Sequence, residues 1–302
     1  MTSSSKNLKW YLSNRCWWMM QRFLPAKVYL SFRYRLLFGR WINWNNPIAF
    51  TEKLQWLKVN YYGKKEASLV DKIQVKQYVR EKVGERYVLP TIGVWTNVED
   101  IPFETLPDEC VLKCNHDSGS IVFLNKTSRG DLQEAKSKLA KALQTNYYWT
   151  GCETPYKYIE PKIFAEPRLV NKNGDDLYDY KFFCFNGCPK IFKIDFNRFV
   201  DHHANYYDIN GDILPFGEVT SPPSYEQKLQ FPDNLSEMIE VARKLSQGLP
   251  FARVDFYNTD GRIILGEMTL FPTSGFGRFT SDEWDERLGS WMTLPPQKTK
   301  IV

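Results

Sequence analysis

Two short turn signals in the second half of the chain constrain the fold most. Asn186-Gly187 and Asp260-Gly261 each lie between two runs rich in β-branched and aromatic residues. A two-residue turn of this composition joins antiparallel strands, because both of its residues readily adopt positive φ. The sequence therefore predicts one hairpin with strands over 179–185 and 190–195 and another with strands over 253–257 and 263–268.

The first half of the chain has a different pattern. Apolar residues recur with helical spacing over 29–37 and 47–57, and amphipathic helices are predicted over 71–82 and 131–143. Short strands are predicted over 87–89, 110–112 and 163–169. The pattern predicts an α+β protein with three parts: a basic, aromatic, helical region over 1–70, a first lobe over 71–160 and a strand-rich second lobe over 161–302.

Positive charge is concentrated at the front of the chain. Residues 1–58 carry ten Lys and Arg against a single acid, Glu52, whereas the rest carries 30 against 34 acids. Such a front end favours an anionic partner such as phospholipid head groups or a pyrophosphate-linked glycan. The alternative is that its aromatic residues simply pack the N-terminal helices. Nucleic acid is not expected, because no recognition-helix or RNA-binding motif is present.

The apolar runs and the cysteines indicate the cellular compartment of the protein. The most apolar early run, over 16–20, is too short for a signal peptide or a spanning helix. The six cysteines lack zinc-site spacing, and free buried thiols are expected. These features predict a cytoplasmic protein, either free or at the inner face of the membrane.

Alternation along the second hairpin brings polar side chains to one face. Arg253 and Asp255 on one strand, with Glu267 and Thr269 on the other, are predicted to face the same side, opposite Val254, Phe256, Leu265 and Met268. Two carboxylates facing each other across a ladder need a cation. Such oxygen ligands suit Mg²⁺, and the arginine suits a phosphate or oxyanion. The alternative is a surface hairpin with solvated acids.

A second polar feature joins a strand lysine to a loop of small residues. Lys113 lies at the end of the predicted strand over 110–112, and Ser118, Gly119 and Ser120 follow. The backbone N–H groups of such a loop can face a phosphate while the lysine supplies a point charge. This is not a Walker A motif, and an ordinary loop is the alternative.

Four further charged residues lie in three of the predicted elements. Lys72 follows Asp71 at a helix start, Glu166 lies within the strand over 163–169, and Asp179 and Lys181 share one face of the next strand. The order of all these parts resembles that of ATP-grasp enzymes. The segments PIAFTEKLQWLK, DYKFFCFNG, VDFYNTDGRI and LFPTSGFGRF resemble the TupA-like ATP-grasp group, which is found in bacterial capsule, O-antigen and teichuronopeptide assembly. The resemblance covers roughly residues 45–285.

The resemblance implies a fold and a nucleotide site. Two α/β lobes with antiparallel sheets would close on ATP, next to the basic helical N-terminal region. It implies that Lys72 and Lys113 contact the α and β phosphates and that Ser118 to Ser120 cover the β and γ phosphates. It further implies that adenine is read by Glu166 with the backbone near Leu169, and that Asp179 lies near ribose or the phosphates.

The resemblance also implies a metal site and a reaction site. Asp255 and Glu267 would hold Mg²⁺, with Thr269 in place of the usual asparagine as a weaker ligand. Lys181 would lie near the γ-phosphate. Arg253, and less directly Arg198, would stabilise the acyl phosphate and the oxyanion formed when an amine attacks.

The implied reaction is ATP-dependent joining of a carboxylate to an amine. The expected partners are a small amine or amino acid and a uronic-acid-containing glycan or sugar nucleotide. A glycosyltransferase of the same pathway is the main alternative, although no Asp-x-Asp motif is found at a strand end. A carbohydrate-binding module is a third. The sequence offers no clear general base, because His116 is a lone loop histidine.

Overall fold

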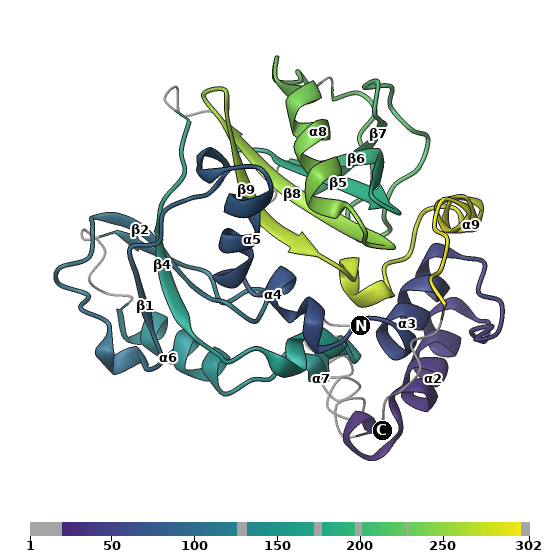
Figure 1. The fold of residues 1–302 in the computed structure, drawn as a ribbon, viewed down its shortest axis with the longest axis horizontal. Helices are drawn as coiled ribbons and strands as arrows, with labels where there is room; N and C mark the ends of the chain where they lie inside the picture. The colour runs from purple at the N-terminus through teal and green to yellow at the C-terminus, as the bar shows by residue number, and fades with distance from the viewer. Residues whose placement is uncertain (1–19, 126–131, 172–176, 197–200, 228, 297–302) are drawn as a thin grey trace, which may run out of the picture.

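Two antiparallel sheets form the framework of the computed structural model, which describes residues 20–125, 132–171, 177–196, 201–227 and 229–296 (Figure 1). The smaller sheet has the strand order β1-β4-β2-β3 and the larger has the order β7-β6-β5-β8-β9. In the part of the chain that the structure describes, the paired strands of both sheets are antiparallel. The sheets therefore give the expected α+β architecture with two lobes.

The larger sheet has one apolar and one polar face. It contains β5 (Asp179–Phe185), β6 (Cys188–Phe196), β7 (His203–Asp208), β8 (Phe251–Thr259) and β9 (Arg262–Thr269). Phe182, Phe192 and Val254 pair across the apolar face and are fully buried. Helix α8 (Leu235–Ser246) lies along this face (Figure 1) and contributes Met238 and Leu245 to the same core.

The smaller sheet is built from β1 (Gly93–Trp95), β2 (Glu109–Cys114), β3 (Val122–Asn125) and β4 (Ile163–Pro167). Helix α6 (Leu132–Leu143) packs Leu139 against Leu112 and Ile163 to form a separate small core. Strand β4 pairs with β1 and β2, although it follows the lobe boundary predicted at residue 161. That boundary itself stays a prediction.

Helices fill the space beside and between the sheets. The first are α2 (Ala26–Phe38) and α3 (Phe50–Asn60), followed by α4 (Ala67–Val70) and α5 (Gln74–Lys82). Helix α7 (Tyr148–Gly151) precedes β4, and α9 (Asp282–Ser290) packs against α3. In Figure 1, α4 and α5 lie between the two sheets, and α2, α3 and α9 gather at one side.

Both predicted hairpins are confirmed. Asn186 and Gly187 have φ values of 49° and 77°, and Asp260 and Gly261 have 50° and 77°. These are the positive φ values that a two-residue turn between twisted strands requires. The strands extend one to two residues beyond most predicted ends.

Other predicted elements differ from the structure. The strand predicted over 87–89 is wrong, because the chain forms a 3₁₀ turn over Glu85–Tyr87 there. The helix predicted from residue 71 begins at Gln74, because Asp71 caps it by accepting hydrogen bonds from the N–H groups of Ile73 and Gln74 at 2.8 and 3.2 Å. The helix predicted from residue 47 begins at Phe50.

The cysteine prediction is confirmed where it can be followed. Cys110, Cys114, Cys152, Cys184 and Cys188 are free thiols, and all but the last are buried. Cys16 lies outside the described residues. Across the described ranges, no helix combines the length and apolar character needed to cross a bilayer.

Candidate active site

One cleft brings together polar residues from both sheets. Its lining includes Lys113 and the loop Ser118 to Ser120 from the smaller sheet, and Asp179, Lys181, Asp255 and Glu267 from the larger sheet. Lys72, in the turn before α5, also lines it. The structure thus gathers nine of the residues singled out from the sequence around one volume. Side chains of this mixed charge suit a ligand with several anionic groups and a bound cation.

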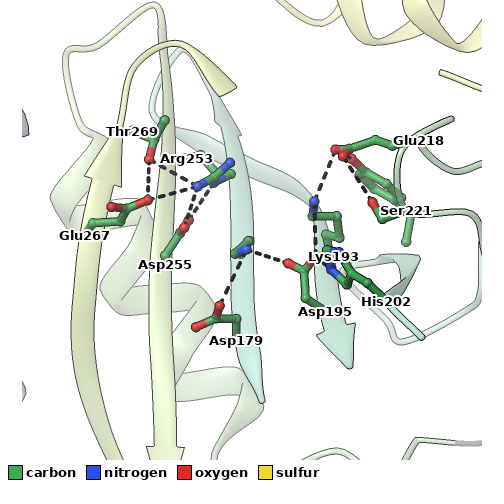
Figure 2. A network of polar contacts seen from close by, with 12 residues as sticks. Asp179, Lys193, Asp195, His202, Glu218, Ser221, Arg253, Asp255, Glu267 and Thr269 are labelled. Atoms are coloured by element: carbon green, nitrogen blue, oxygen red, sulfur yellow. Dashed lines mark hydrogen bonds and ion pairs between the residues drawn. The ribbon is translucent and has the colours of Figure 1, made fainter. Parts of the chain in front are cut away.

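An arginine organises the acidic end of the cleft (Figure 2). Arg253 donates to both oxygens of Asp255, from Nε at 2.7 Å and from Nη2 at 2.6 Å. Nη2 also approaches Glu267 Oε1 at 3.1 Å and Thr269 Oγ1 at 3.2 Å. The β8–β9 register places Asp255 opposite Glu267. The predicted common face of these four residues is confirmed, and Val254, Phe256 and Met268 are buried behind it.

The two carboxylates have different protonation energetics. Burial raises the pKa of Asp255 to about 6, although Arg253 beside it favours the charged form. Burial also opposes ionisation of Glu267, but the cations of Lys72, Arg253 and Lys181 lower its pKa to about 2. The side chain of Glu267 is still 39% exposed, so solvent screens part of this effect. The cleft thus holds a firmly ionised carboxylate beside one that ionises near pH 6.

This donor set fits magnesium. Two carboxylates and the Thr269 hydroxyl meet at one place, and Mg²⁺ takes one or two carboxylates and fills its shell with phosphate oxygens and water. In the described ranges no group of three or more His, Cys, Asp or Glu could hold a metal alone. A cation here would therefore depend on a second ligand such as a phosphate.

A buried carboxylate on the smaller sheet pairs with two lysines, one from α5 and one from β2. Glu166 pairs with Lys76 at 2.6 Å and with Lys113 at 3.0 Å. Burial opposes ionisation of Glu166, yet these two cations lower its pKa below the usual value. Lys113 remains part of the cleft wall while its ammonium is held by Glu166. Glu166 thereby positions Lys113, and its role toward adenine stays a prediction.

The β2–β3 loop is held by side chains at its two ends. The Ser120 hydroxyl donates to Asp117 Oδ1 at 2.6 Å and accepts from Cys114 N at 2.9 Å. Both of these hydrogen bonds stabilise the conformation of the loop. The ammonium of Lys72 donates to the carbonyl of Asp117. Gly119 has a φ of 102°, which a residue with a side chain rarely adopts. The loop is therefore shaped to present its backbone to the cleft.

A chain of ion pairs continues from the cleft across the polar face of the larger sheet (Figure 2). Lys181 contacts Asp179 at 3.5 Å and Asp195 at 2.5 Å. Lys193 lies 3.5 Å from Asp195 and 3.2 Å from Glu218. Although burial opposes ionisation of Asp195, Lys193 and Lys181 hold its pKa below the usual value. Lys193, Asp195 and Glu218 were not predicted from the sequence.

The three histidines differ in what they can do. His116 is buried, and its Nε2 lies 2.9 Å from the carbonyl of Thr145 while Nδ1 lies 3.3 Å from Asn115 Oδ1. Both nitrogens are thus used inside the fold. His202 instead bonds Asp195 Oδ1 through Nε2 at 2.8 Å and is 37% exposed. His203 contacts Asp201 and the carbonyl of Pro222.

Some predicted residues lie apart from the cleft lining. Leu169 follows the end of β4 and is half-buried outside it, and Glu166 lies behind Lys113. Thr269 and Arg253 join through their hydrogen bonds to Asp255 and Glu267. Arg198 lies outside the described residues. Lys76 has no role predicted from the sequence, although its place one turn after Lys72 puts both lysines on one side of the chain near the cleft.

Comparison with known families agrees with this arrangement. A sequence model described as TupA-like ATP-grasp matches residues 52–293, most of the chain. The chain belongs to the TupA-like ATP-grasp family. As a member of this family, it has the ATP-grasp fold and is an ATP-dependent ligase. A comparison with curated proteins gave no match.

Several solved structures are similar to this ATP-grasp chain. D-alanine–D-alanine ligase from Bacillus anthracis, in complex with ATP, is 17% identical over 80% of this chain and 70% of that chain, with a TM-score of 0.43. The same enzyme from Helicobacter pylori is 14% identical over 81% and 69%, with a TM-score of 0.43. A D-cycloserine synthetase is 15% identical over 74% and 69%, with a TM-score of 0.38.

Proposed function

We propose that this ATP-grasp protein activates a carboxylate as its acyl phosphate and transfers the acyl group to an amine. The observation that carries the proposal is the cleft itself, where Lys72 and Lys113 face Asp255 and Glu267. Phosphoryl transfer needs cations placed around the transferring group and little covalent help from the protein. The cleft supplies cations from both sheets.

The nucleotide lies across the cleft in this proposal. Lys72 and Lys113 hold the α and β phosphates, and the backbone of Ser118 to Ser120 covers the β and γ phosphates. Asp179 lies toward ribose or the phosphates. Adenine is read near Leu169, beside the strand that carries Glu166. The fixed lysines and backbone dipoles need little rearrangement when charge develops.

Asp255, Glu267 and Thr269 hold Mg²⁺ in this proposal, and the ion neutralises phosphate charge when bound. Arg253 has a donor group close to both carboxylates, and its fork geometry suits an acyl phosphate oxygen or an oxyanion. Lys181 lies next to Asp255 across the β5–β8 pair and approaches the γ-phosphate. Arg198 is proposed for the same oxyanion as Arg253.

His202 is the general base for the amine in this proposal. Its Nε2 is held by Asp195, and Asp195 also contacts Lys181 in the cleft lining. Three strand spacings, about 14 Å, separate β6 from β9. In this proposal the imidazole, which Asp195 links to Lys181, lies on the acceptor side of the reacting carbonyl and takes the amine proton.

The proposed substrates are an amino acid or small amine and a sugar carboxylate, such as a uronic acid of a surface glycan or sugar nucleotide. The family resemblance supports this bacterial polysaccharide role, at the cytoplasmic side of the membrane. No feature of the cleft favours the glycosyltransferase alternative.

Trapping with hydroxylamine tests the proposed reaction. ATP, Mg²⁺, glucuronate or UDP-glucuronate and hydroxylamine are expected to give a hydroxamate together with ADP and phosphate. Asp255→Asn is expected to lower the yield at least a hundredfold, because it removes one charge at the same volume. Lys190→Ala, an exposed lysine on β6, is the control. Release of UDP without ADP would instead indicate a glycosyltransferase.

A further inference from the structure

Helix α2 carries apolar side chains on two faces. Tyr29, Leu30 and Tyr34 are almost completely buried and pack in a small core with Ile42 and Phe276. A soluble protein needs only one such face to fix a surface helix. A helix that is apolar on its other side as well is covered by something else.

The second apolar face of α2 is open to solvent. Val28, Phe32 and Leu36 follow one another at four-residue spacing, with Phe32 46% and Leu36 69% exposed. Trp41, 55% exposed, makes an edge contact with Phe32 at 5.5 Å between ring centroids. Phe23, before the helix, is 85% exposed. Together these five residues form an apolar ridge.

The charges beside this apolar ridge are positive. Arg22, Lys27 and Arg35 are exposed along it, and residues 20–51 contain no acid. Glu52 and Asp285 contact the segment that follows α2. Glu52 is buried with its oxygens on the N–H groups of residues 43, 48 and 49, and Asp285 is buried against Thr51.

We infer that the apolar ridge docks the protein on an anionic lipid bilayer. Apolar and aromatic side chains enter the boundary between head groups and acyl chains, while Lys and Arg meet the phosphates. A protein partner would need acidic residues around an apolar groove, whereas a bilayer supplies both features over any area. Tyr29, Leu30 and Tyr34 stay packed in the small core. Helix α2 therefore lies flat on the bilayer surface while it remains attached to the rest of the protein.

The packed side of α2 contacts the segment that follows β9. Arg33 on α2 donates to the carbonyl of Thr150 at 2.7 Å and stacks over Phe276 at 4.4 Å. Phe276 follows the turn Pro272–Gly275 at the end of β9, the strand that carries Glu267. The docked helix is thus joined to the segment that follows β9. The docking itself does not depend on the proposed reaction.

Vesicle sedimentation of the full chain tests the inference. Wild type is expected to sediment with phosphatidylglycerol vesicles in 100 mM salt and to remain in solution with phosphatidylcholine vesicles. Phe32→Gln/Leu36→Gln is expected to weaken the binding at least tenfold. Ile92→Gln/Val94→Gln, which alters two exposed apolar residues on and beside β1, is expected to bind as wild type does. Lys27→Glu/Arg35→Glu tests the charges without altering the ridge.

Three results would contradict the inference that α2 docks on a bilayer. The inference fails if wild type does not sediment with phosphatidylglycerol vesicles, or if both altered pairs on α2 bind as wild type does. It also fails if ultracentrifugation shows a dimer that Phe32→Gln/Leu36→Gln dissociates while neither vesicle type binds, because the ridge would then join two copies. Circular dichroism shows whether each variant is folded. If Phe32→Gln/Leu36→Gln does not fold, the binding of Lys27→Glu/Arg35→Glu decides the test.

Discussion

Arg253 donates two hydrogen bonds, at 2.7 and 2.6 Å, to the carboxylate of Asp255, which lies two residues further along the same strand. The same guanidinium reaches Glu267 on the neighbouring strand. Without this cation, two carboxylates would face each other across the ladder. Arg253 thus compensates both acids and fixes their positions at this end of the cleft.

Removing the arginine should destabilise the protein. Arg253→Gln leaves Asp255 and Glu267 without their shared partner, and an uncompensated buried charge costs about 3 kcal/mol. Urea denaturation at pH 7 measures this loss. Arg243→Gln, in an exposed pair with Glu240, is the control and should cost under about 0.5 kcal/mol. Equal losses in the two variants would show that Arg253 does not compensate the acids.

The loop glycine can be tested with a matched pair. Gly119 and Gly84 both have positive φ, 102° and 110°, and neither has an atom within 4 Å of an added Cβ. Gly119→Ala and Gly84→Ala should therefore each lose about 1–2 kcal/mol of stability through backbone strain. Only Gly119→Ala should weaken ATP binding, by about tenfold, because only its loop lines the cleft. Equal ATP affinity of both variants would contradict a phosphate role for the loop.

His202 separates the two halves of the proposed reaction. His202→Gln should keep hydroxamate formation, because hydroxylamine attacks without help from a base. Transfer to glycine should fall at least a hundredfold, since its ammonium must lose a proton. Imidazole added to His202→Ala should restore part of that transfer. If the variant loses both products, His202 supports the fold or the first step instead.

A pH effect on stability is expected from Asp285. Burial raises its pKa to about 6, although hydrogen bonds from Thr51 favour the ionised form. The protonated form is favoured in the folded state, so this contribution is complete below about pH 4 and is lost as pH rises to 6. Wild type should therefore lose up to about 3 kcal/mol relative to Asp285→Asn between pH 4 and 7. Parallel pH profiles in urea denaturation would show that Asp285 keeps an ordinary pKa.

Local signals carried the sequence-based prediction of the hairpins. Asn186-Gly187 and Asp260-Gly261 encode their own turns, and period-two alternation gave the face shared by Arg253, Asp255 and Glu267. Strands such as β1 and β3 were missed, because short segments become strands only when they pair with distant partners. The ATP-grasp family itself was recognised from the order of motifs and confirmed by the family match.

The buried network beyond Lys181 needed tertiary information. A regular ladder from the Asn186-Gly187 turn would place Lys181 opposite Phe192. The register shifts between Phe183 and Cys184, near Pro189, which cannot donate a ladder hydrogen bond. This bulge moves Lys193 opposite Lys181 and so creates the contacts of Asp195 with both lysines. Pro189 indicates an irregularity, but nothing local in the sequence specifies a shift of one residue.

Isothermal titration with ATP and Mg²⁺ tests the central claim most directly. The cleft predicts micromolar ATP binding that requires magnesium, that Lys113→Ala weakens at least tenfold, and that Lys190→Ala leaves unchanged. UDP-hexose and UDP-uronate, titrated in parallel, should not compete for the site. Binding of a nucleotide sugar without any binding of ATP would contradict the assignment of this cleft.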